Sequence, residues 1–113
     1  MFSRRHRFHG YGSLKAVYQR GQTVRGPQIS LKFNRTGSTK PYRVAVVVSR
    51  KVSKSAVTRN RIRRRVFEAV RQSADKIAPG TNLVFTVFSD QAAETDAVKL
   101  QQTIAKLLSE AGL

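Results

Sequence analysis

Residues 44–65 read VAVVVSRKVSKSAVTRNRIRRR and join a run of β-forming residues to a run of arginines. The first part, residues 44–48, is apolar and dominated by valine, which is typical of a strand. The second part holds five arginines within the seven residues from Arg59 to Arg65. A strand that leads into an arginine helix is suited to holding a polyanion. This segment therefore determines both the fold that we expect and the kind of ligand.

Residues 57–72 fit an amphipathic helix. At 3.6 residues per turn, a single stripe carries the apolar positions Ile62, Val66, Ala69 and Val70. The opposite face carries Asn60, Arg64 and Arg71, together with the aromatic Phe67. Arg59 and Arg63 lie on one flank of the stripe, and Arg61 and Arg65 on the other. We therefore expect a helix that packs on a sheet and still shows guanidinium groups over most of its circumference.

The charge of this helix favours a nucleic-acid partner. A guanidinium group is planar, stays charged and can donate two hydrogen bonds to one phosphate. An ordinary solvated helix face mixes both signs of charge, because oppositely charged residues at i,i+4 stabilise it. Here Glu68 is the single acid between Ser49 and Arg71. The pattern thus indicates a surface for RNA rather than an ordinary solvated face.

Composition supports the same interpretation. The chain has 113 residues and a net charge of +16, and residues 1–71 hold 19 of its 22 Lys and Arg residues but one of its six acids. The 40% hydrophobic content is enough for a core, so residues 1–113 are expected to form one RNA-binding domain. The absence of cysteine excludes disulfides and thiolate zinc fingers. The charged start, without an apolar stretch, predicts a cytoplasmic protein with no signal peptide or membrane span.

The remaining elements follow from local patterns. Residues 1–12, basic and with two glycines, are expected to form an arm. Ser13 is the expected N-cap of a short helix over residues 14–20, with Leu14, Val17 and Tyr18 on one face and Gly21 as its stop. Alternation of Ile29, Leu31 and Phe33 predicts a half-buried strand, and residues 42–49 a central strand covered on both faces.

The second half of the chain closes the predicted fold. The arginine helix is expected to end near Pro79-Gly80, and a further strand covers residues 83–88. A last helix, at about residues 95–109, should complete the core through Ala97, Leu100, Ile104, Leu107, Leu108 and Ala111. The expected order is α-β-β-β-α-β-α, an α/β (α+β) two-layer sandwich with one small mixed sheet.

The segment from Val46 to Arg64 resembles the signature of the bacterial ribonuclease P protein component. That family is marked by a strand, a Lys/Arg pair (here Arg50-Lys51), a short loop and an Arg-Asn-Arg helix (here Arg59-Asn60-Arg61). The basic-aromatic pair Arg7-Phe8 and the order of elements are similar to the family over nearly the whole chain. The resemblance implies a fold like domain 2 of ribosomal protein S5.

The resemblance also implies a function. It implies a subunit of ribonuclease P, in which a catalytic RNA with bound Mg²⁺ removes the 5′ leader of precursor tRNA. The expected RNA contacts are Arg50, Lys51, Lys54, Arg59, Asn60, Arg61, Arg63, Arg64, Arg65 and Arg71. A cleft between the arginine helix and the open sheet face would hold the single-stranded leader, with contacts from Arg7, Phe8, Lys15, Tyr18 and Phe33. The sheet-face aromatic of the family corresponds either to Lys32 or, displaced by one residue, to Phe33.

No set of residues indicates a hydrolytic site, so we expect no catalytic residue, cofactor or metal on the protein itself. The pair His6 and His9 has a metal-like spacing, but contact of the basic arm with RNA is favoured. The expected partners are the catalytic RNA and precursor tRNA, with neither a membrane nor a protein partner required. A basic ribosomal protein is the main alternative. A DNA-binding module is a weaker one, because consecutive arginines contact phosphates rather than base edges.

Two aromatic residues are open to more than one interpretation. Tyr18 shares a face with Leu14 and Val17, and is either a leader contact or a core residue. Phe67 is either a stacking platform for RNA or a residue packed beneath the N-terminal arm.

Overall fold

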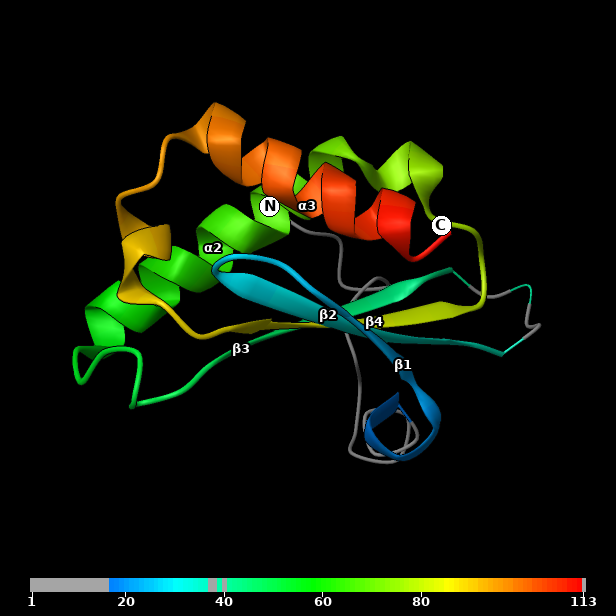
Figure 1. The fold of residues 1–113 in the computed structure, drawn as a ribbon, viewed down its shortest axis with the longest axis horizontal. Coiled ribbons are helices and arrows are strands. Elements are labelled where there is room, and N and C mark those ends of the chain that lie inside the picture. Colours follow the sequence, from blue (N-terminus) through cyan, green and yellow to red (C-terminus); the bar gives the residue numbers. More distant parts are fainter. Residues whose placement is uncertain (1–16, 37–38, 40, 113) are drawn as a thin grey trace.

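The computed structural model describes residues 17–36, 39 and 41–112, without the side chain of Lys76 (Figure 1). Residues 17–20 form a helical turn. Three strands follow, which are β1 (Gln22–Arg25), β2 (Ile29–Arg35) and β3 (Arg43–Val48). The rest of the chain forms α2 (Ala56–Gln72), the 3₁₀ turn η2 (Ala74–Lys76), β4 (Thr81–Val87), the 3₁₀ turn η3 (Asp90–Ala93) and α3 (Ala97–Glu110).

The strands form one mixed sheet in the order β1-β2-β4-β3. The pairs β1–β2 and β2–β4 are antiparallel, while β3 runs parallel to β4. Parallel neighbours need a crossover connection, and α2 supplies it. Within the described residues this confirms the predicted order of elements and the mixed sheet. Strand β1, which the apolar pattern did not locate, is mostly exposed along its four residues.

The prediction that residues 42–49 form the central strand is wrong. Strand β3 lies at the edge of the sheet and pairs with β4, and its residues alternate between buried and half-buried. The central strand beside it is β4, where six of the seven residues are buried. Both strands are rich in valine, so composition alone does not distinguish the edge from the centre.

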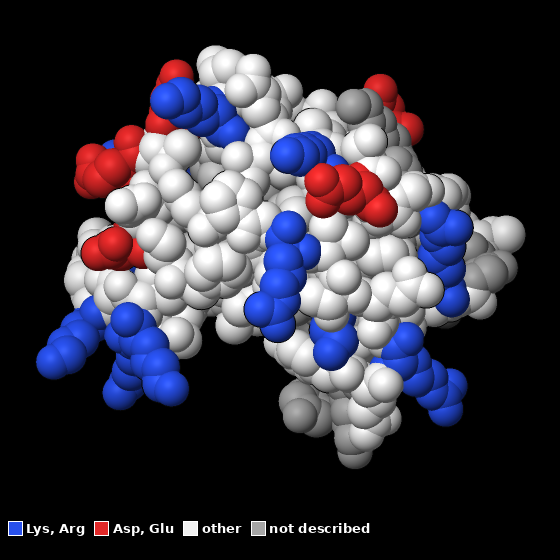
Figure 2. Space-filling model, viewed as in Figure 1, with Lys and Arg blue, Asp and Glu red and all other residues white. Residues whose placement is uncertain are grey.

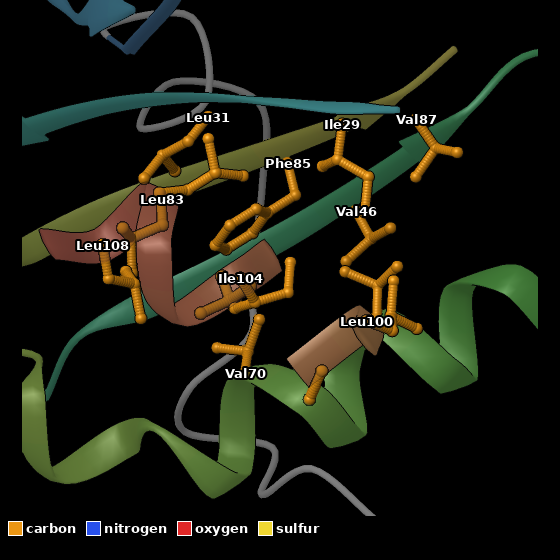
Figure 3. Close-up of a cluster of buried hydrophobic side chains, with 14 of the residues drawn as sticks. Ile29, Leu31, Val46, Val70, Leu83, Phe85, Val87, Leu100, Ile104 and Leu108 are labelled. Carbon is orange, nitrogen blue, oxygen red and sulfur yellow. The ribbon is translucent and has the colours of Figure 1, made fainter. Parts of the chain in front are cut away.

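Helices α2 and α3 cover one face of the sheet (Figure 1), and the hydrophobic core lies between these two layers. The predicted stripe of α2 is confirmed, since the buried residues of the helix are Ile62, Val66, Ala69 and Val70. In Figure 3 the ring of Phe85, from β4, lies between the sheet and Ile104 of α3. Burying a side chain of this size contributes about 1.5–3 kcal/mol.

The helix ends differ from the sequence-based expectation in two places. Helix α2 ends at Gln72, not near Pro79, because its apolar stripe ends at Val70 and the separate turn η2 then leads to the buried Ile77. In α3 the core residues are Leu100, Ile104, Leu107 and Leu108. Ala97 is exposed in the first turn, so its predicted place in the core is wrong, while Ala111 packs at the margin of the core.

Candidate nucleic-acid interface

Helix α2 turns its apolar stripe toward the sheet, which leaves the rest of its surface for solvent and ligands. Its exposed polar positions are Asn60, Arg61, Arg64, Arg71 and Gln72. The flanking positions Arg59, Arg63 and Arg65 are half-buried. Arginines beside an apolar stripe commonly lay their stems along it and direct their charged groups outward. The polar side chains of α2 therefore fall into two groups, one exposed to solvent and one half-buried beside the apolar stripe.

The loop before α2 gathers cations at the start of the helix. Arg50, Lys51 and Lys54 are exposed and, with Arg59, line a shallow hollow; we call these four residues the loop–helix cluster. No acid is among the described residues that line the hollow. The positive end of the helix dipole adds to this charge. A phosphate that entered the hollow would meet positive charge from both loop and helix.

Two hydrogen bonds give this loop its shape. The Ser55 hydroxyl caps α2 by accepting a hydrogen bond from the Thr58 N–H at 3.2 Å. The Arg59 guanidinium donates to the Ser53 carbonyl at 2.9 Å, which ties the loop to the first turn of the helix. Arg59 thus holds the loop and also lines the hollow.

Arg65, which the resemblance places against RNA, has its guanidinium bonded to the protein backbone. It donates to the carbonyls of Ala92, Ala93 and Thr95, which end η3 and lead into α3. These partners lie 27 to 30 residues away along the chain. The contacts fasten α2 to the segment between β4 and α3, so the structure indicates a role for Arg65 in stability.

Replacing Arg65 by alanine should lower the free energy of unfolding by about 2–4 kcal/mol, because a charged donor is lost and three carbonyls lose their partner. Arg65→Lys should recover only part of this, since one ammonium group does not reproduce the planar fork. Urea unfolding followed by circular dichroism measures the effect. Arg61→Ala, on the exposed face, is the matched control and should change stability by less than about 0.5 kcal/mol. Equal losses in both variants would contradict the backbone role.

Two other positions on α2 have partners on the helix itself. Arg63 donates to the Asn60 side-chain oxygen one turn earlier. Arg71 makes two hydrogen bonds to Glu68, at 3.0 and 2.5 Å, and these bonds hold the pKa of Glu68 below its usual value. Since Arg71 already has an anionic partner, Arg61 and Arg64 are the α2 arginines for which no partner in the protein is recorded among the described residues.

Charge is unevenly distributed over the surface. In Figure 2, basic side chains project at the lower left, where Figure 1 places the loop from β3 to α2. Acidic side chains stand mainly at the left and upper left of the same view, over η3 and the start of α3. This agrees with the sequence, in which five of the six acids follow residue 71. A polyanion is therefore drawn toward the loop end of α2.

The opposite face of the sheet carries a second candidate surface. The helical turn at residues 17–20 lies on this side, away from α2 and α3 (Figure 1). Val17 is fully buried, whereas Tyr18 is 43% exposed. The Lys32 ammonium group lies 5.8 Å from the centre of the Tyr18 ring, within range of a cation–π contact. Tyr18 is therefore not a core residue, and it stands beside a positive charge.

Gly21 ends this helical turn as predicted, and the reason is close approach. Its N–H donates to the Val17 carbonyl at 2.8 Å. A Cβ atom at this position would lie 2.3 Å from that carbonyl oxygen and 2.9 Å from the Phe33 carbonyl oxygen. Only glycine lets the turn pass so close to β2, and this brings Tyr18 over Lys32.

Phe33 does not belong to this second surface. It is 5% exposed and lies in the core, where it pairs with Leu83 across β2 and β4. Adjacent strand residues point to opposite faces, so Lys32 occupies the open face. The predicted leader contact at Phe33 is therefore wrong, and of the two alternatives for the sheet-face position Lys32 is the one found there.

The predicted cleft between the arginine helix and the open sheet face is also wrong. Helix α2 covers the other face of the sheet, because its apolar stripe packs into the core there (Figure 1). The arginine surface and the Tyr18 surface therefore lie on opposite sides of the sheet. The other expected leader contacts, Arg7, Phe8 and Lys15, and the histidines His6 and His9 lie outside the described residues.

Two aromatic residues differ from the sequence-based view. Phe67 is half-buried and packs against the core, so it is not an outward stacking platform. Phe88, which sequence reasoning did not single out, is 52% exposed just after β4, and its N–H donates to the Gln28 carbonyl at 3.1 Å.

Lys32 could have been identified from the sequence as an open-face residue. Ile29, Leu31 and Phe33 alternate toward the core, which places the residue between Leu31 and Phe33 on the other face.

Within the described part of the chain, no three His, Cys, Asp or Glu residues group as metal ligands would. Among the same residues, no helix is long and apolar enough to cross a membrane. The two candidate surfaces are therefore the cationic face of α2 with its preceding loop, and the pair Tyr18 and Lys32 on the opposite face of the sheet.

Comparison with known proteins gives a consistent result. The family model described as Ribonuclease P matches residues 2–112. The ribonuclease P protein component of Pseudanabaena sp. (strain PCC 6903) is 36% identical over 95 residues, which cover 84% of this chain and 81% of that protein. The component from Picosynechococcus sp. (strain ATCC 27264 / PCC 7002 / PR-6) is 32% identical over 106 residues, covering 94% and 90%.

Solved structures share the fold. The Staphylococcus aureus RNase P protein at 2.0 Å superposes with a TM-score of 0.79 at 20% identity, covering 94% of both chains. The RNase P protein from Thermotoga maritima gives 0.80 at 22% identity, covering 94% of this chain and 97% of that one. The four-stranded mixed sheet with helices on one face is thus the architecture of these proteins.

Proposed function

The chain belongs to the bacterial ribonuclease P protein family, and from this premise we propose how its two surfaces divide their RNA contacts. It is the protein subunit of ribonuclease P, which processes the 5′ end of precursor tRNA, and it associates with the RNase P RNA. We assign the exposed side of α2 and the loop–helix cluster to that RNA. We assign the surface around Tyr18 and Lys32 to the single-stranded 5′ leader of the precursor.

The loop–helix cluster is the observation that carries the first assignment. Four cations and a helix N-terminus surround one hollow, and the described residues that line it include no acid. Arg61 and Arg64 continue the positive surface along α2. Arginine and lysine arranged in this way bind phosphates irrespective of base sequence, which suits a partner recognised by its folded backbone.

The second assignment rests on Tyr18 and its neighbour. Single strands are commonly held by aromatic rings on which bases stack, beside cations that follow the backbone. Tyr18 supplies an exposed ring, and Lys32 supplies a charge at 5.8 Å from it. Precursor tRNA differs from mature tRNA by its leader, so a single-strand surface gives the holoenzyme a preference for its substrate over its product.

We place the hydrolysis in Mg²⁺ ions held by the RNA, so that the protein contributes binding and positioning. The acids of the sequence support this, because the first of them is Glu68 and the cationic half precedes it. We further propose that residues 1–113 act as a single RNA-binding domain in the cytoplasm, where precursor tRNA is made in bacteria. The family assignment replaces the ribosomal and DNA-binding alternatives.

Tyr18→Ala tests the second assignment in the reconstituted holoenzyme. Stacking contributes about 1–3 kcal/mol per base, so leader-bearing precursor should bind about 5- to 100-fold more weakly. Mature tRNA should bind equally well before and after the change. Equilibrium binding of both RNAs measures the difference, and Gln19→Ala, an exposed neighbour on the same helical turn, is the matched control.

The same experiment contains its own checks. Because Tyr18 is exposed, the thermal unfolding midpoint should stay close to that of the unchanged protein. The protein without the RNase P RNA should leave the precursor uncut. If both ligands lose affinity alike, or if the substitution has no effect on either, the leader does not lie on Tyr18.

A further inference from the structure

A groove of about 440 Å³ lies between α3 and the turn that joins β1 to β2. Three cations line it, Arg25 from the end of β1 and Lys99 and Lys106 from α3. One acid, Glu110, stands at the same groove. In Figure 2 this side faces the viewer, and basic side chains stand over α3 and β1 with an acidic one among them. None of these residues belongs to the two surfaces assigned above.

Glycine at the turn brings the two walls of the groove together. A Cβ atom on Gly26 would lie 2.8 Å from the Ile29 carbonyl oxygen and 3.2 Å from Leu107 Cδ2. The turn is also closed by a hydrogen bond from the Gly26 N–H to the Ile29 carbonyl at 3.0 Å. The exposed Pro27 therefore gives the groove apolar surface beside its cations, and the buried Leu107 lies beneath it.

The arrangement of charge and apolar surface indicates unpaired nucleotides. Lys99 and Lys106 are seven residues apart on one side of α3, about 10 Å along the helix axis. Arg25 stands on the opposite wall, so an anionic chain in the groove would have cations on both sides. The apolar lining suits the flat face of a base. A volume typical of small-ligand sites admits single nucleotides rather than a duplex.

The position of the groove favours the leader over the RNase P RNA. Strands β3 and β1 form opposite edges of the sheet. Helix α2 packs beside β3, and α3 beside β1 and β2. On the β1 side, Thr23 pairs with Lys32, the neighbour of Tyr18. Arg25 follows two residues later, about 7 Å along the strand. An RNA strand that leaves Tyr18 along β1 and passes around this edge of the sheet therefore arrives at the groove, whose other wall is α3.

We propose that this groove binds the part of the 5′ leader beyond the nucleotides at Tyr18, and that the protein thereby senses leader length. The proposal rests on the proposed function, in which the leader lies at Tyr18. It adds a site at the β1 edge, with Arg25, Lys99 and Lys106 contacting phosphates and the exposed Pro27 contacting a base.

The test uses reconstituted holoenzyme with two precursors, whose leaders are about 4 and about 12 nucleotides long, within the range that single-strand sites span. The triple variant Arg25→Gln, Lys99→Gln, Lys106→Gln should bind the long-leader precursor about 3- to 100-fold more weakly, as expected for three exposed ion pairs. The slope of log affinity against log salt should fall by about 2, at roughly 0.7 per contact on a single strand. Binding of the short-leader precursor and of the RNase P RNA should not change.

Charge-matched variants make the assignment specific. Lys99→Arg with Lys106→Arg keeps both charges and should keep long-leader affinity. Glu110→Gln removes the acid of the groove and should strengthen long-leader binding, whereas Asp90→Asn, the same charge change on η3, should not. All substituted side chains are exposed, so the unfolding midpoints should agree.

Three outcomes would overturn the proposal: equal loss for both leader lengths, loss of affinity for the RNase P RNA, or no change in the triple variant. The first would show contact with the tRNA body, and the second contact with the catalytic RNA. Failure of the proposed function would appear separately, as unchanged binding of the short-leader precursor by Tyr18→Ala.

Discussion

Replacing Ile62 by aspartate should unfold the protein, while the same replacement at Arg64 should leave it folded. Ile62 is fully buried in the core, and Arg64 is exposed two residues later on the same helix. A carboxylate at position 62 would lose its water without gaining a partner, and the apolar contacts of the isoleucine would be lost as well. The combined cost, about 4–5 kcal/mol or more, is comparable to the whole stability of a small domain.

Far-UV circular dichroism and urea unfolding distinguish the two variants. Ile62→Asp should show no cooperative transition at 25 °C, or a midpoint far below that of the unchanged protein. Arg64→Asp should keep a cooperative transition and lose RNA affinity. A stable Ile62→Asp protein would mean that the apolar stripe of α2 does not pack on the sheet.

The second large effect is expected on RNA binding. Replacing the five exposed cations Arg50, Lys51, Lys54, Arg61 and Arg64 by glutamine should weaken binding of the RNase P RNA about 10- to 1,000-fold, from the usual range for exposed ion pairs. The slope of log affinity against log salt should decrease by about 4, at roughly 0.7–0.9 per lost phosphate contact. Titrations at several salt concentrations measure both quantities. Arg59 is left in place, because it holds the Ser53 carbonyl.

A matched pair of single variants on α2 makes this test sharper. Arg64→Gln should reduce the salt slope by just under one unit. Arg71→Gln should reduce it less, since Arg71 is already bonded to Glu68. Equal salt slopes for these two variants would mean that RNA displaces Glu68 from Arg71. An unchanged salt slope in the fivefold variant would mean that the RNA does not bind the exposed side of α2 and its loop.

The sequence was sufficient to predict the parts of the fold that local periodicity determines. The stripe of α2, with Ile62 and Val66 at its centre, follows from the 3.6-residue period, and the inward face of β2 follows from alternation. Strand β1 was not located because its residues Gln22–Arg25 are mostly exposed and show no apolar alternation. Its existence depends on pairing with β2, which local composition does not record.

Two of the errors, at Arg65 and in the place of β3, have a common cause, which is contact between distant parts of the chain. Arg65 bonds to carbonyls 27 to 30 residues away, so its sequence neighbours give no sign of that role. The order of β3 and β4 in the sheet likewise depends on long-range pairing. The Phe33 error is different, because a shift of one residue along a strand exchanges its faces, and Lys32 was the position consistent with the alternation of β2.

The edge position of β3 has a consequence for the behaviour of the free protein. Four valines and one alanine, from Val44 to Val48, lie along a strand whose outer side pairs with no described strand. Such an edge is a template for joining a second copy and beginning aggregation. Arg43 precedes the run, and Arg50 and Lys51 follow it closely, so two approaching edges repel each other. Arg50 and Lys51, which we assign to the RNA, should therefore also oppose edge-to-edge pairing of free chains.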